Sequence, residues 1–513
     1  MLRNIFFSRY KMKSLKNIPV FLFVLLLYSC ASSNKNFDPQ KKFSAQQLQQ
    51  DYSLLRNILE KKHPSLYWYT PKDSMNMYFE KYYNTIKDSM TEQQFGWQVI
   101  APLTDKIHCG HTSFSRSKAY NNWVAGKKFP SFPLFLKCWN DTMAVASNLN
   151  RKDSVLKRGV LITSINGIRN AELIKIMFSY LTEDGYANNV NYSRLSNNFP
   201  FYHRNIFGVS KLYAVTYLDG KGAEQHIDIP VFDISRDSSK KNKDSLITKR
   251  EPTQKKQSKQ QRLQEIRSLA VDTTNNTAIV TINSFSSGSL RKFYRQTFRY
   301  IKKTGINNVV LDIRDNGGGR IRLSTLLTKY VTRVNFKVAD TSFAVTKTLS
   351  PYSKYIKQGF INNLGLFFLT KKNKDGNYHF GHWERKINKP KAINNYAGNL
   401  YVLIAGNTFS AAALFSNAVK GQPGVVLLGE DTGGGWYGND GILIPDIILP
   451  NTHVKVRLPL FRLVQYKHVL KDGRGIAPDI YIGPNYNAFL KGIDYKMKFV
   501  LDMIHNKQFA RGN

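Results

Sequence analysis

The side chains best suited to chemistry lie in three short segments that are far apart in the sequence. The first, residues 408–413, reads T-F-S-A-A-A and follows an apolar run at 400–404, which predicts a strand, a turn and a helix that begins near Ser410. A serine at a helix N-terminus has backbone N–H groups and the positive end of the helix dipole beside its hydroxyl. Those N–H groups could stabilise an oxyanion, as a serine nucleophile requires. A serine that only caps its helix fits the same pattern.

The second segment, residues 311–320, reads L-D-I-R-D-N-G-G-G-R, so three glycines come directly after an apolar strand. Glycines let the backbone turn sharply and expose N–H groups, which can bind a phosphate or an oxyanion. No Gly-Lys-Ser or Gly-Lys-Thr follows, and the G-x-G-x-x-G spacing is absent, which argues against a nucleotide-binding loop. An oxyanion-binding loop and a simple glycine turn both remain open from the residues alone.

The third segment is Cys109-Gly110-His111-Thr112, at the end of a helical pattern. A histidine on a turn could act as a general base, although a structural or exposed histidine fits equally well. Cys109 is a rival nucleophile in principle. Cys109 and Cys138 could also form a disulfide in an oxidising compartment. Three cysteines are too few for a disulfide framework or a Cys-built zinc site, so we expect no metal and no cofactor.

The segment that leads to this histidine has helical patterns. Residues 40–115 read as a helical region, in which S-x-x-Q at 44–47 and T-x-x-Q at 91–94 are capping boxes. The first box is followed by apolar residues on one helical face, which indicates core: Leu48, Tyr52, Leu55 and Leu59.

A mostly β region is expected at 128–232. The apolar strand at 161–165 is closed by Asn166-Gly167, which predicts a hairpin. The pattern G-x-x-I-x-S-I-N-G at 159–167 also resembles the centre of a PDZ domain. Residues 233–267 hold eleven basic and five acidic residues and read as a basic linker or surface insertion.

An alternating α/β core is expected at 268–490. Its apolar runs at 308–313 and 400–404 are typical of strands that are covered on both faces. Residues 340–395 form an insertion rich in Lys and Asn, and residues 491–513 are expected to form a C-terminal helix.

Together, the G-H-T, D-x-R-x-N-G-G-G and T-x-S-A-A segments, in this order, resemble peptidase family S41. This is the group of tail-specific or C-terminal processing serine peptidases, with tricorn-core and retinoid-binding-protein-like relatives. Two further segments match the family, L-G-E-D-T-G-G-G at 428–435 and G-I-A-P-D at 475–479. The resemblance implies an α+β multidomain protein with an N-terminal helical region, a PDZ-like β domain and a C-terminal α/β (ClpP/crotonase-like) peptidase core. It also implies a protein or peptide substrate.

The family's catalytic positions carry over residue by residue. Ser410 matches the nucleophile, and the amides expected to form the oxyanion hole match Gly317, Gly318 and Ala411. One branch of the family uses a Lys in an F-G-K-G motif after the serine, but here residues 432–436 read T-G-G-G-W. The other branch uses the histidine of G-H-T.

His111 matches that histidine, and Asp472 stands where the same branch often has an acidic residue that could orient it. The family often has Glu at the fourth position of its S-A-x-E motif, where this chain has Ala413. This departure raises the possibility of altered specificity or lost activity.

The N-terminus has the pattern of an export signal. Basic residues lie between positions 3 and 16, an apolar stretch covers 18–27, and L-Y-S-C follows at 27–30. This arrangement resembles a bacterial lipobox, which predicts a lipoprotein signal peptide at 1–29, lipidation of Cys30 and a tether at 30–39. An ordinary secretory signal with an incidental Cys is the alternative. We therefore expect a lipid-anchored protein of the bacterial cell envelope, on the periplasmic face of the outer membrane, with a lipid bilayer as partner.

The chain is strongly basic. Its 75 Lys and Arg against 35 Asp and Glu give a formal charge of +40, and removal of the five basic residues of the signal leaves 40 − 5 = +35. Such a charge could serve nucleic acid, but no helix-turn-helix, zinc-finger or RNA-binding signature is present. We expect no nucleic-acid partner and instead a solvated basic surface that lies near anionic lipid or polyanions.

The resulting hypothesis is a cell-envelope serine endopeptidase that hydrolyses peptide bonds through a Ser410 acyl-enzyme, with His111 as general base. The alternative is a catalytically inactive S41-like lipoprotein that binds peptides or lipids.

Overall fold

The computed structural model describes residues 37–233, 258–467 and 469–512. The expected signal peptide, Cys30 and most of the basic linker therefore lie outside the described residues. From residue 39 onward the described residues belong to one compact unit. Within the described part of the chain, the helices lack the length and hydropathy needed to cross a membrane.

The region that precedes the histidine is built from short helices. They are α2 (Ala45–Lys62), α3 (Lys72–Tyr83), α4 (Glu92–Phe95), the π-helix η1 (Gly96–Ile100) and α5 (Ala101–Asp105), with a two-stranded sheet of β1 (Lys42–Phe43) and β2 (Met90–Thr91). Both predicted capping boxes are present, at Ser44 and at Thr91. The predicted stripe on α2 is buried throughout.

These helices share their apolar core with segments more than 200 residues further along the chain. Residues of α2, such as Leu48 and Leu55, belong to the same cluster as Leu349, Leu366 and Phe461. A buried carboxylate adds a polar tie, because Asp51 Oδ2 accepts hydrogen bonds from both the backbone N and the Oγ1 of Thr452. The position of His111 is therefore fixed by the late part of the chain as well as by its own helices.

The region expected to be mostly β contains a six-stranded antiparallel sheet. Its strands are β4 (Leu134–Trp139), β5 (Thr142–Asn148), β6 (Leu161–Ile165), β7 (Ile168–Arg169), β8 (Leu212–Leu218) and β9 (Glu224–Pro230). The predicted hairpin is confirmed: Ile165 pairs with Ile168, and Asn166 and Gly167 both adopt positive φ, 50° and 78°.

Helices also lie in and next to this region: α6 (Lys118–Val124), α7 (Asn170–Phe178) and α8 (Asn189–Phe207). The sequence pattern did not predict α8, because it holds several Asn, has Pro200 inside and is kinked at Asn198. Its buried Leu195 and Phe199 belong to the core of the sheet, so tertiary packing overrides the weak helix propensity.

The end of the expected linker is ordered. Ser258 caps the helix α9 (Lys259–Ile266), which leads directly into the first strand of the next sheet.

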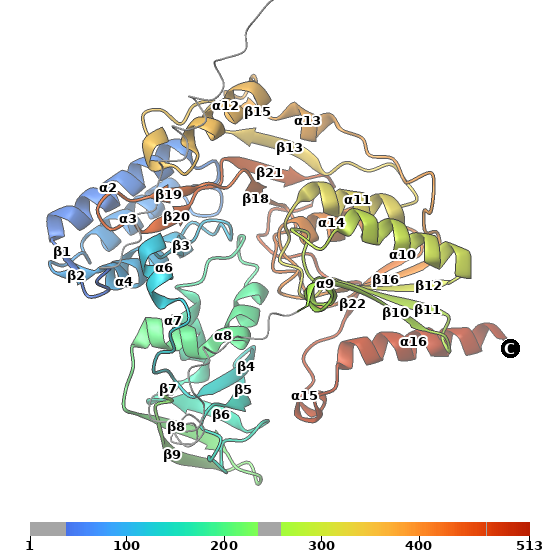
Figure 1. Cartoon of the computed structure of the whole chain (residues 1–513), viewed down its shortest axis with the longest axis horizontal. Helices are drawn as coiled ribbons and strands as arrows, with labels where there is room; N and C mark the ends of the chain where they lie inside the picture. Colours follow the sequence, from blue (N-terminus) through green and yellow to red (C-terminus); the bar gives the residue numbers. More distant parts are fainter. Residues whose placement is uncertain (1–36, 234–257, 468, 513) are drawn as a thin grey trace, which may run out of the picture. The chain divides into compact units, whose positions relative to one another are not determined.

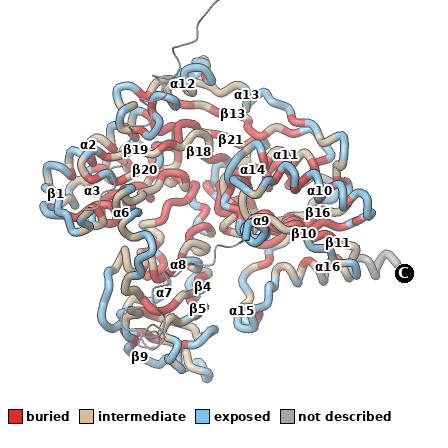
Figure 2. Tube along the Cα trace, viewed as in Figure 1, coloured by how far each residue is buried: buried red, intermediate tan, exposed pale blue. Residues whose placement is uncertain are grey.

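A second six-stranded sheet forms the C-terminal core (Figure 1). Its order is β10 (Arg267–Asp272), β11 (Thr277–Ile282), β12 (Asn308–Asp312), β16 (Asn399–Ile404), β17 (Val425–Gly429) and β22 (Ile480–Tyr481). Only β10 is antiparallel to its neighbour. The two strands predicted to be covered on both faces are β12 and β16, and both are buried, apart from the half-buried first residue of β16 (Figure 2).

Helices cover both faces of this sheet. The helices α10 (Leu290–Thr304), α11 (Ile321–Val331) and α14 (Ala411–Val419) share one apolar cluster with the strands, while α16 (Tyr495–Gly512) packs Val500 and Ile504 against the other face. The short α15 (Tyr486–Lys491) precedes α16. Because β12 and β16 are parallel, the loops that follow them, which hold the three glycines and Ser410, meet at one edge of the sheet.

The insertion at 340–395 takes part in a five-stranded sheet, ordered β14 (Lys371–Lys372), β15 (Tyr378–His379), β13 (Ala339–Ala344), β21 (Phe461–Gln465) and β18 (Gly438–Ile442). It also contains η5 (Ser353–Tyr355), α12 (Gly359–Leu369) and α13 (Gly381–Arg385). A three-stranded sheet joins β19 (Asp446–Ile448), β20 (Lys455–Arg457) and β3 (Phe114–Ser115). Since β3 begins three residues after His111, its pairing with β20 connects the histidine to the C-terminal part.

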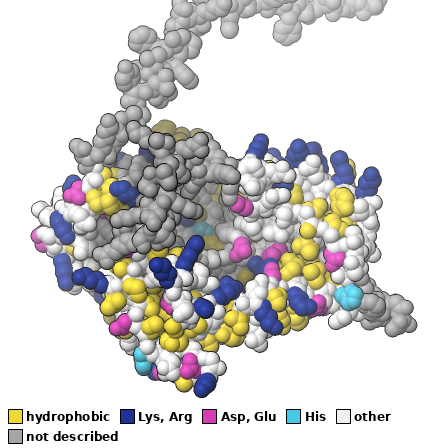
Figure 3. Space-filling model, turned by 60° about the horizontal axis from the view of Figure 1, so that its bottom comes forward, with side chains coloured by type: hydrophobic (Ala, Val, Ile, Leu, Met, Phe, Trp, Pro, Cys, Tyr) yellow, Lys and Arg dark blue, Asp and Glu magenta, His cyan; other side chains and the backbone are white. Residues whose placement is uncertain are grey.

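The charge excess is visible on the surface. Lys and Arg side chains are spread over the face drawn in Figure 3, between apolar side chains.

Candidate active site

The structure brings Ser410 and His111 into contact. Ser410 Oγ lies 3.0 Å from His111 Nε2, although the two residues are 299 positions apart in the sequence. This distance fits a hydrogen bond in which the hydroxyl donates to Nε2, provided that His111 carries its proton on Nδ1. Both residues come from segments that the sequence singled out for chemistry.

The backbone of Ser410 is strained. Ser410 lies in the turn between β16 and α14 with φ 53° and ψ −119°, a region that costs a non-glycine residue about 1–3 kcal/mol. The turn is held by Thr408, whose Oγ1 donates to Ile313 O and accepts from Ala405 N. Phe409 N donates to Asn316 O at 3.0 Å, so the serine turn is also bonded to the glycine-rich loop. These bonds hold the hydroxyl of Ser410 toward His111.

The small residues after Ser410 allow a close approach. Ala411, Ala412 and Ala413 are fully buried. A Cβ placed on Gly434 would lie 2.8 Å from Ala413 Cβ, so Ala413 and Gly434 meet with no room between them. Ala413, which stands where the family often has Glu, is therefore packed against the loop of Gly434.

His111 is positioned by its neighbours on two sides. The ring of Phe409 lies against the imidazole with centroids 4.9 Å apart. On the other side, Asp184 Oδ1 lies 3.6 Å from His111 Nδ1 and accepts a hydrogen bond from Gly110 N at 2.9 Å. Thr112, the next residue, has its Oγ1 2.7 Å from His63 Nε2 in the core. The imidazole therefore has one nitrogen at the serine and the other at a buried carboxylate.

Asp184, and not Asp472, is the acid beside His111, which corrects the expectation from sequence. Asp472 is exposed, and its Oδ1 accepts a hydrogen bond from Arg474 N in its own turn. The loop of Asp472 does contact the loop of Asp184, but through its backbone: Gly473 O accepts a hydrogen bond from Tyr186 N at 2.8 Å. A close approach of Gly185 to Gly473 leaves no room for a side chain there.

The residues expected to form an oxyanion hole surround Ser410 unequally. A Cβ on Gly318, which has φ +96°, would lie 2.7 Å from Ser410 Cβ and 3.0 Å from Ala411 N, so only glycine fits. The Gly318 N–H donates to Asn316 Oδ1 at 2.9 Å. Ala411 is the first residue of α14, and its N–H has no carbonyl partner inside the helix. Gly317, which precedes Gly318, is exposed, and a Cβ placed on it would meet no atom within 4 Å.

A buried polar group lies behind the histidine. Asp440 accepts hydrogen bonds from Ser65 Oγ at 2.5 Å and from Cys109 Sγ at 3.0 Å. Burial raises the pKa of Asp440 to about 6. Burial, with Asp440 and Asp184 nearby, raises the pKa of the Cys109 thiol well above its usual range. Cys109 is therefore a poor nucleophile, because it lacks thiolate character.

The contacts of Cys109 bear on disulfide formation and on metal binding at the site. Cys109 and Cys138 are both buried free thiols, so they do not form a disulfide in this structure. Potential ligand atoms of Cys109, His111 and Asp184 all lie within 4.8 Å of one another. However, the thiol of Cys109 already donates to Asp440, and this bond competes with a metal for the sulfur.

Gly441 completes the surroundings of Ser410, and the sequence did not point to it. A Cβ at this position would lie 3.0 Å from Ser410 Oγ and 3.4 Å from His111 Nε2. Gly441 belongs to β18, and it also lines a cavity of about 800 Å³ that opens beside the serine. Because Gly441 has no side chain, no Cβ lies against the hydroxyl on the side that faces this cavity.

Comparison with known proteins identifies a related family and a shared fold. Residues 276–482 match the model of peptidase family S41. Mature CPAF in complex with lactacystin has the same fold, with a TM-score of 0.60 at 12% identity over 90% of this chain and 99% of that chain. A serine-to-alanine mutant of CPAF gives 0.62 at 11% identity, over 90% and 97% of the two chains. No curated protein matches the chain.

Proposed function

Because the match over residues 276–482 makes this chain a member of peptidase family S41 and thereby a serine peptidase, we propose that it is an endopeptidase of the cell envelope that uses Ser410 as nucleophile and His111 as general base. The observation that carries the proposal is the 3.0 Å contact between Ser410 Oγ and His111 Nε2, at a strained serine next to a helix N-terminus. The alternative, a catalytically inactive lipoprotein, would not need a serine and a histidine held in contact.

In the proposed reaction, Ser410 Oγ attacks the carbonyl carbon of the scissile peptide bond while His111 Nε2 takes the hydroxyl proton. The imidazolium that forms is stabilised by the carboxylate of Asp184, 3.6 Å from Nδ1. His111 then gives the proton to the leaving amine, and a water molecule, activated by the same imidazole, hydrolyses the acyl-enzyme.

The tetrahedral oxyanion would be held by backbone N–H groups of Ala411, Gly317 and Gly318. Each such donor is worth about 3–4 kcal/mol in comparable enzymes. The Ala411 N–H is free of an intrahelical partner, whereas the Gly318 N–H must first leave Asn316 Oδ1. We therefore assign Ala411 as the donor that needs no rearrangement.

The proposal is tested by labelling the purified, signal-free protein with a fluorophosphonate probe. We expect the wild type to be labelled and Ser410→Ala and His111→Ala to lose labelling. A folded wild type that neither reacts with the probe nor cleaves unstructured protein substrates would favour the inactive alternative. Labelling that persists in Ser410→Ala would instead assign another nucleophile.

Two further parts of the proposal concern regions outside the peptidase core. The sheet of β4 to β9, with its Asn-Gly hairpin, supports a PDZ-like module at 128–232 that binds an extended peptide by strand addition. The lipobox-like sequence supports a lipid anchor on Cys30. Fractionation of cells that express the wild type or Cys30→Ser tests the anchor, because only the wild type is expected in the membrane fraction.

A further inference from the structure

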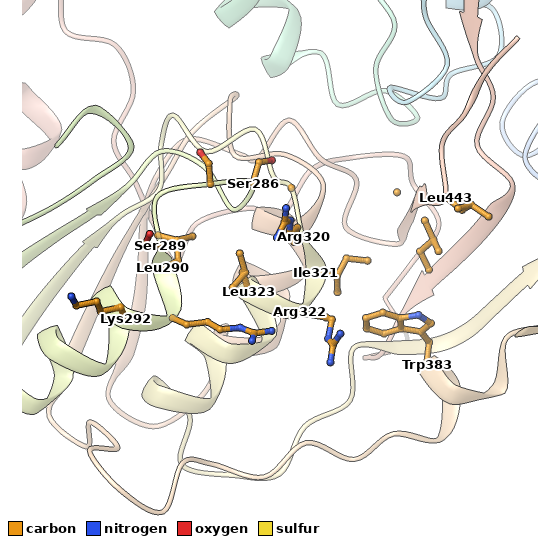
Figure 4. A pocket seen from close by; sticks show the side chains of 15 residues that line it. Ser286, Ser289, Leu290, Lys292, Arg320, Ile321, Arg322, Leu323, Trp383 and Leu443 are labelled. Atoms are coloured by element: carbon orange, nitrogen blue, oxygen red, sulfur yellow. The ribbon is translucent and has the colours of Figure 1, made fainter. Parts of the chain in front are cut away.

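The cavity of about 800 Å³ beside Ser410 is lined by residues from separate segments. Figure 4 shows that they come from the start of α10, the start of α11, the segment around Trp383 and the end of β18. The cavity reaches the candidate site at two glycines: Gly441, whose Cβ position is 3.0 Å from Ser410 Oγ, and Gly319, next to Gly318. A peptide bound at Ser410 would extend into this cavity.

The charged side chains of the lining all have one sign. They are Arg291, Lys292, Arg320 and Arg322, each exposed, and among the described residues no Asp or Glu lines the cavity. Across the described ranges of the chain, none of the four makes an ion pair with an acidic side chain. By contrast, Arg314 nearby in sequence is bonded to Asp312 and Asp494. The cavity therefore presents positive charge without a partner from this part of the protein.

The positive charge continues into an adjoining cavity. This second cavity, of about 640 Å³, shares Arg291, Arg322 and Trp383 with the first and adds Lys329 and Lys386. Its lining, as far as the structure describes the chain, likewise holds no acidic residue. Burial and the neighbouring Lys386 and Lys391 lower the pKa of Lys329, as is expected where like charges accumulate. An anionic ligand would relieve this repulsion.

Three serines and two glycines also line the first cavity, and its largest uncharged part is formed by apolar side chains: Leu290, Ile321, Leu323, Trp383, Ile442 and Leu443. Such a surface can hold a large apolar side chain next to the cations. The combination differs from a phosphate site, which has little use for an apolar floor of this size.

We propose that this cavity selects peptide substrates in which a large apolar side chain is flanked by Asp or Glu. The inference rests on the proposed peptidase function and deepens it by naming the substrate class. Arg320 and Arg322 are the specificity-determining residues, because Arg320 precedes α11 and Arg322 lies in its first turn, directly after the glycine-rich loop that contacts Ser410. A substrate carboxylate would meet them as soon as its backbone lies along that loop.

The test compares two fluorogenic peptides that differ only in charge. One carries Phe flanked by two Glu on each side, and the other has Gln at those four positions. Each exposed ion pair contributes a factor of about 1.4 to 5, so two such pairs predict a kcat/KM about 2- to 30-fold higher for the Glu peptide. The Debye length, beyond which exposed charges are largely screened from one another, falls from about 10 Å at 0.1 M salt to about 3 Å at 1 M. The preference for the Glu peptide should therefore shrink as NaCl is added.

The matched variants separate the cavity from the general basic surface. In Arg320→Gln/Arg322→Gln, the ratio of kcat/KM for the Glu and Gln peptides should fall toward one. The control Lys302→Gln/Lys303→Gln removes the same charge from the far end of α10, where both residues are exposed and outside the lining, and should keep the ratio of the wild type. Equal ratios in both double variants would overturn the proposal in favour of a nonspecific effect of net charge.

Two arms keep this inference distinct from the proposed function. Amidation of the C-terminus of the Glu peptide should leave its preference over the Gln peptide unchanged. If amidation abolished this preference, the cations of the cavity would bind a terminal carboxylate and not the Glu side chains. Binding of fluorescein-labelled Glu and Gln peptides to Ser410→Ala, measured by anisotropy, reports the preference without catalysis. Tighter binding of the Glu peptide with no hydrolysis by the wild type would sink only the peptidase function, whereas equal binding of both peptides would overturn only the selectivity.

Discussion

Replacing Asp184 by Asn removes the negative charge beside His111 while keeping a side chain of nearly the same shape. The Asn side chain retains an oxygen that can accept from Gly110 N, the bond of 2.9 Å that orders the histidine turn. The replacement removes the negative charge that faces the imidazolium formed during the reaction. At 3.6 Å and an effective dielectric constant of about 20, that charge stabilises the imidazolium by about 4–5 kcal/mol. We therefore expect kcat/KM to fall about 10³-fold in Asp184→Asn.

The assay is single-turnover labelling by a fluorophosphonate, followed by kcat/KM on a fluorogenic peptide, with the melting temperature as a check on folding. Asp472→Asn is the matched control, since this exposed carboxylate bonds to Arg474 N and should lose less than two-fold. If Asp184→Asn kept more than a third of the activity of the wild type, or if Asp472→Asn lost as much, our assignment of the orienting acid would be wrong.

Three further outcomes follow from contacts around the site. Gly441→Ala places a methyl group 3.0 Å from Ser410 Oγ and 2.9 Å from Asn439 Oδ1, and should slow fluorophosphonate labelling at least about ten-fold. Because Gly441 has no positive φ, we expect the variant to fold, which its melting temperature checks. Burial raises the pKa of Asp440 from an ordinary 3.8 to about 6, so the folded protein holds this proton more tightly than the unfolded chain. The wild type should thus lose up to roughly 3 kcal/mol relative to Asp440→Asn as pH rises from about 4 to about 6, and urea unfolding measures the difference. The buried Cys109 thiol, whose pKa is raised, should resist iodoacetamide in the native protein at pH 7.5, and rapid alkylation with loss of activity would restore it as a rival nucleophile.

Residues with a local pattern were accessible to sequence reasoning. The strand, turn and helix around Ser410 follow from an apolar run and three alanines, and the hairpin at Asn166-Gly167 follows from turn chemistry. His111 stood out because it follows a helix in a short Gly-His-Thr segment. In each case the signal lies within about ten residues of the feature that it predicts.

Residues that act through tertiary contact were not accessible. Asp184 lies in an Asp-Gly turn between α7 and α8, more than 70 residues from His111, and nothing in its neighbours marks it as catalytic. The resemblance favoured Asp472 because it stands where the histidine branch of the family often has an acidic residue. In the structure its loop approaches the loop of Asp184, but the two meet through Gly473 and Gly185 and not through the carboxylate of Asp472. Gly441 is one glycine among 33, and only the fold shows its distance from Ser410.

The pairing of β3 with β20 joins segments that are made at different times during translation. A ribosome that adds about 5–20 residues per second makes His111 roughly 15–60 seconds before Ser410, which lies 299 positions later. The strand beside the histidine gains its partner only when residues 455–457 have also been made. Until Ser410 is made, His111 is present without the serine, and until residues 455–457 are made the strand beside the histidine lacks its partner. The order of synthesis thus keeps an unfinished chain harmless to its neighbours, and a product truncated before Ser410 would stay inert without any inhibitory segment.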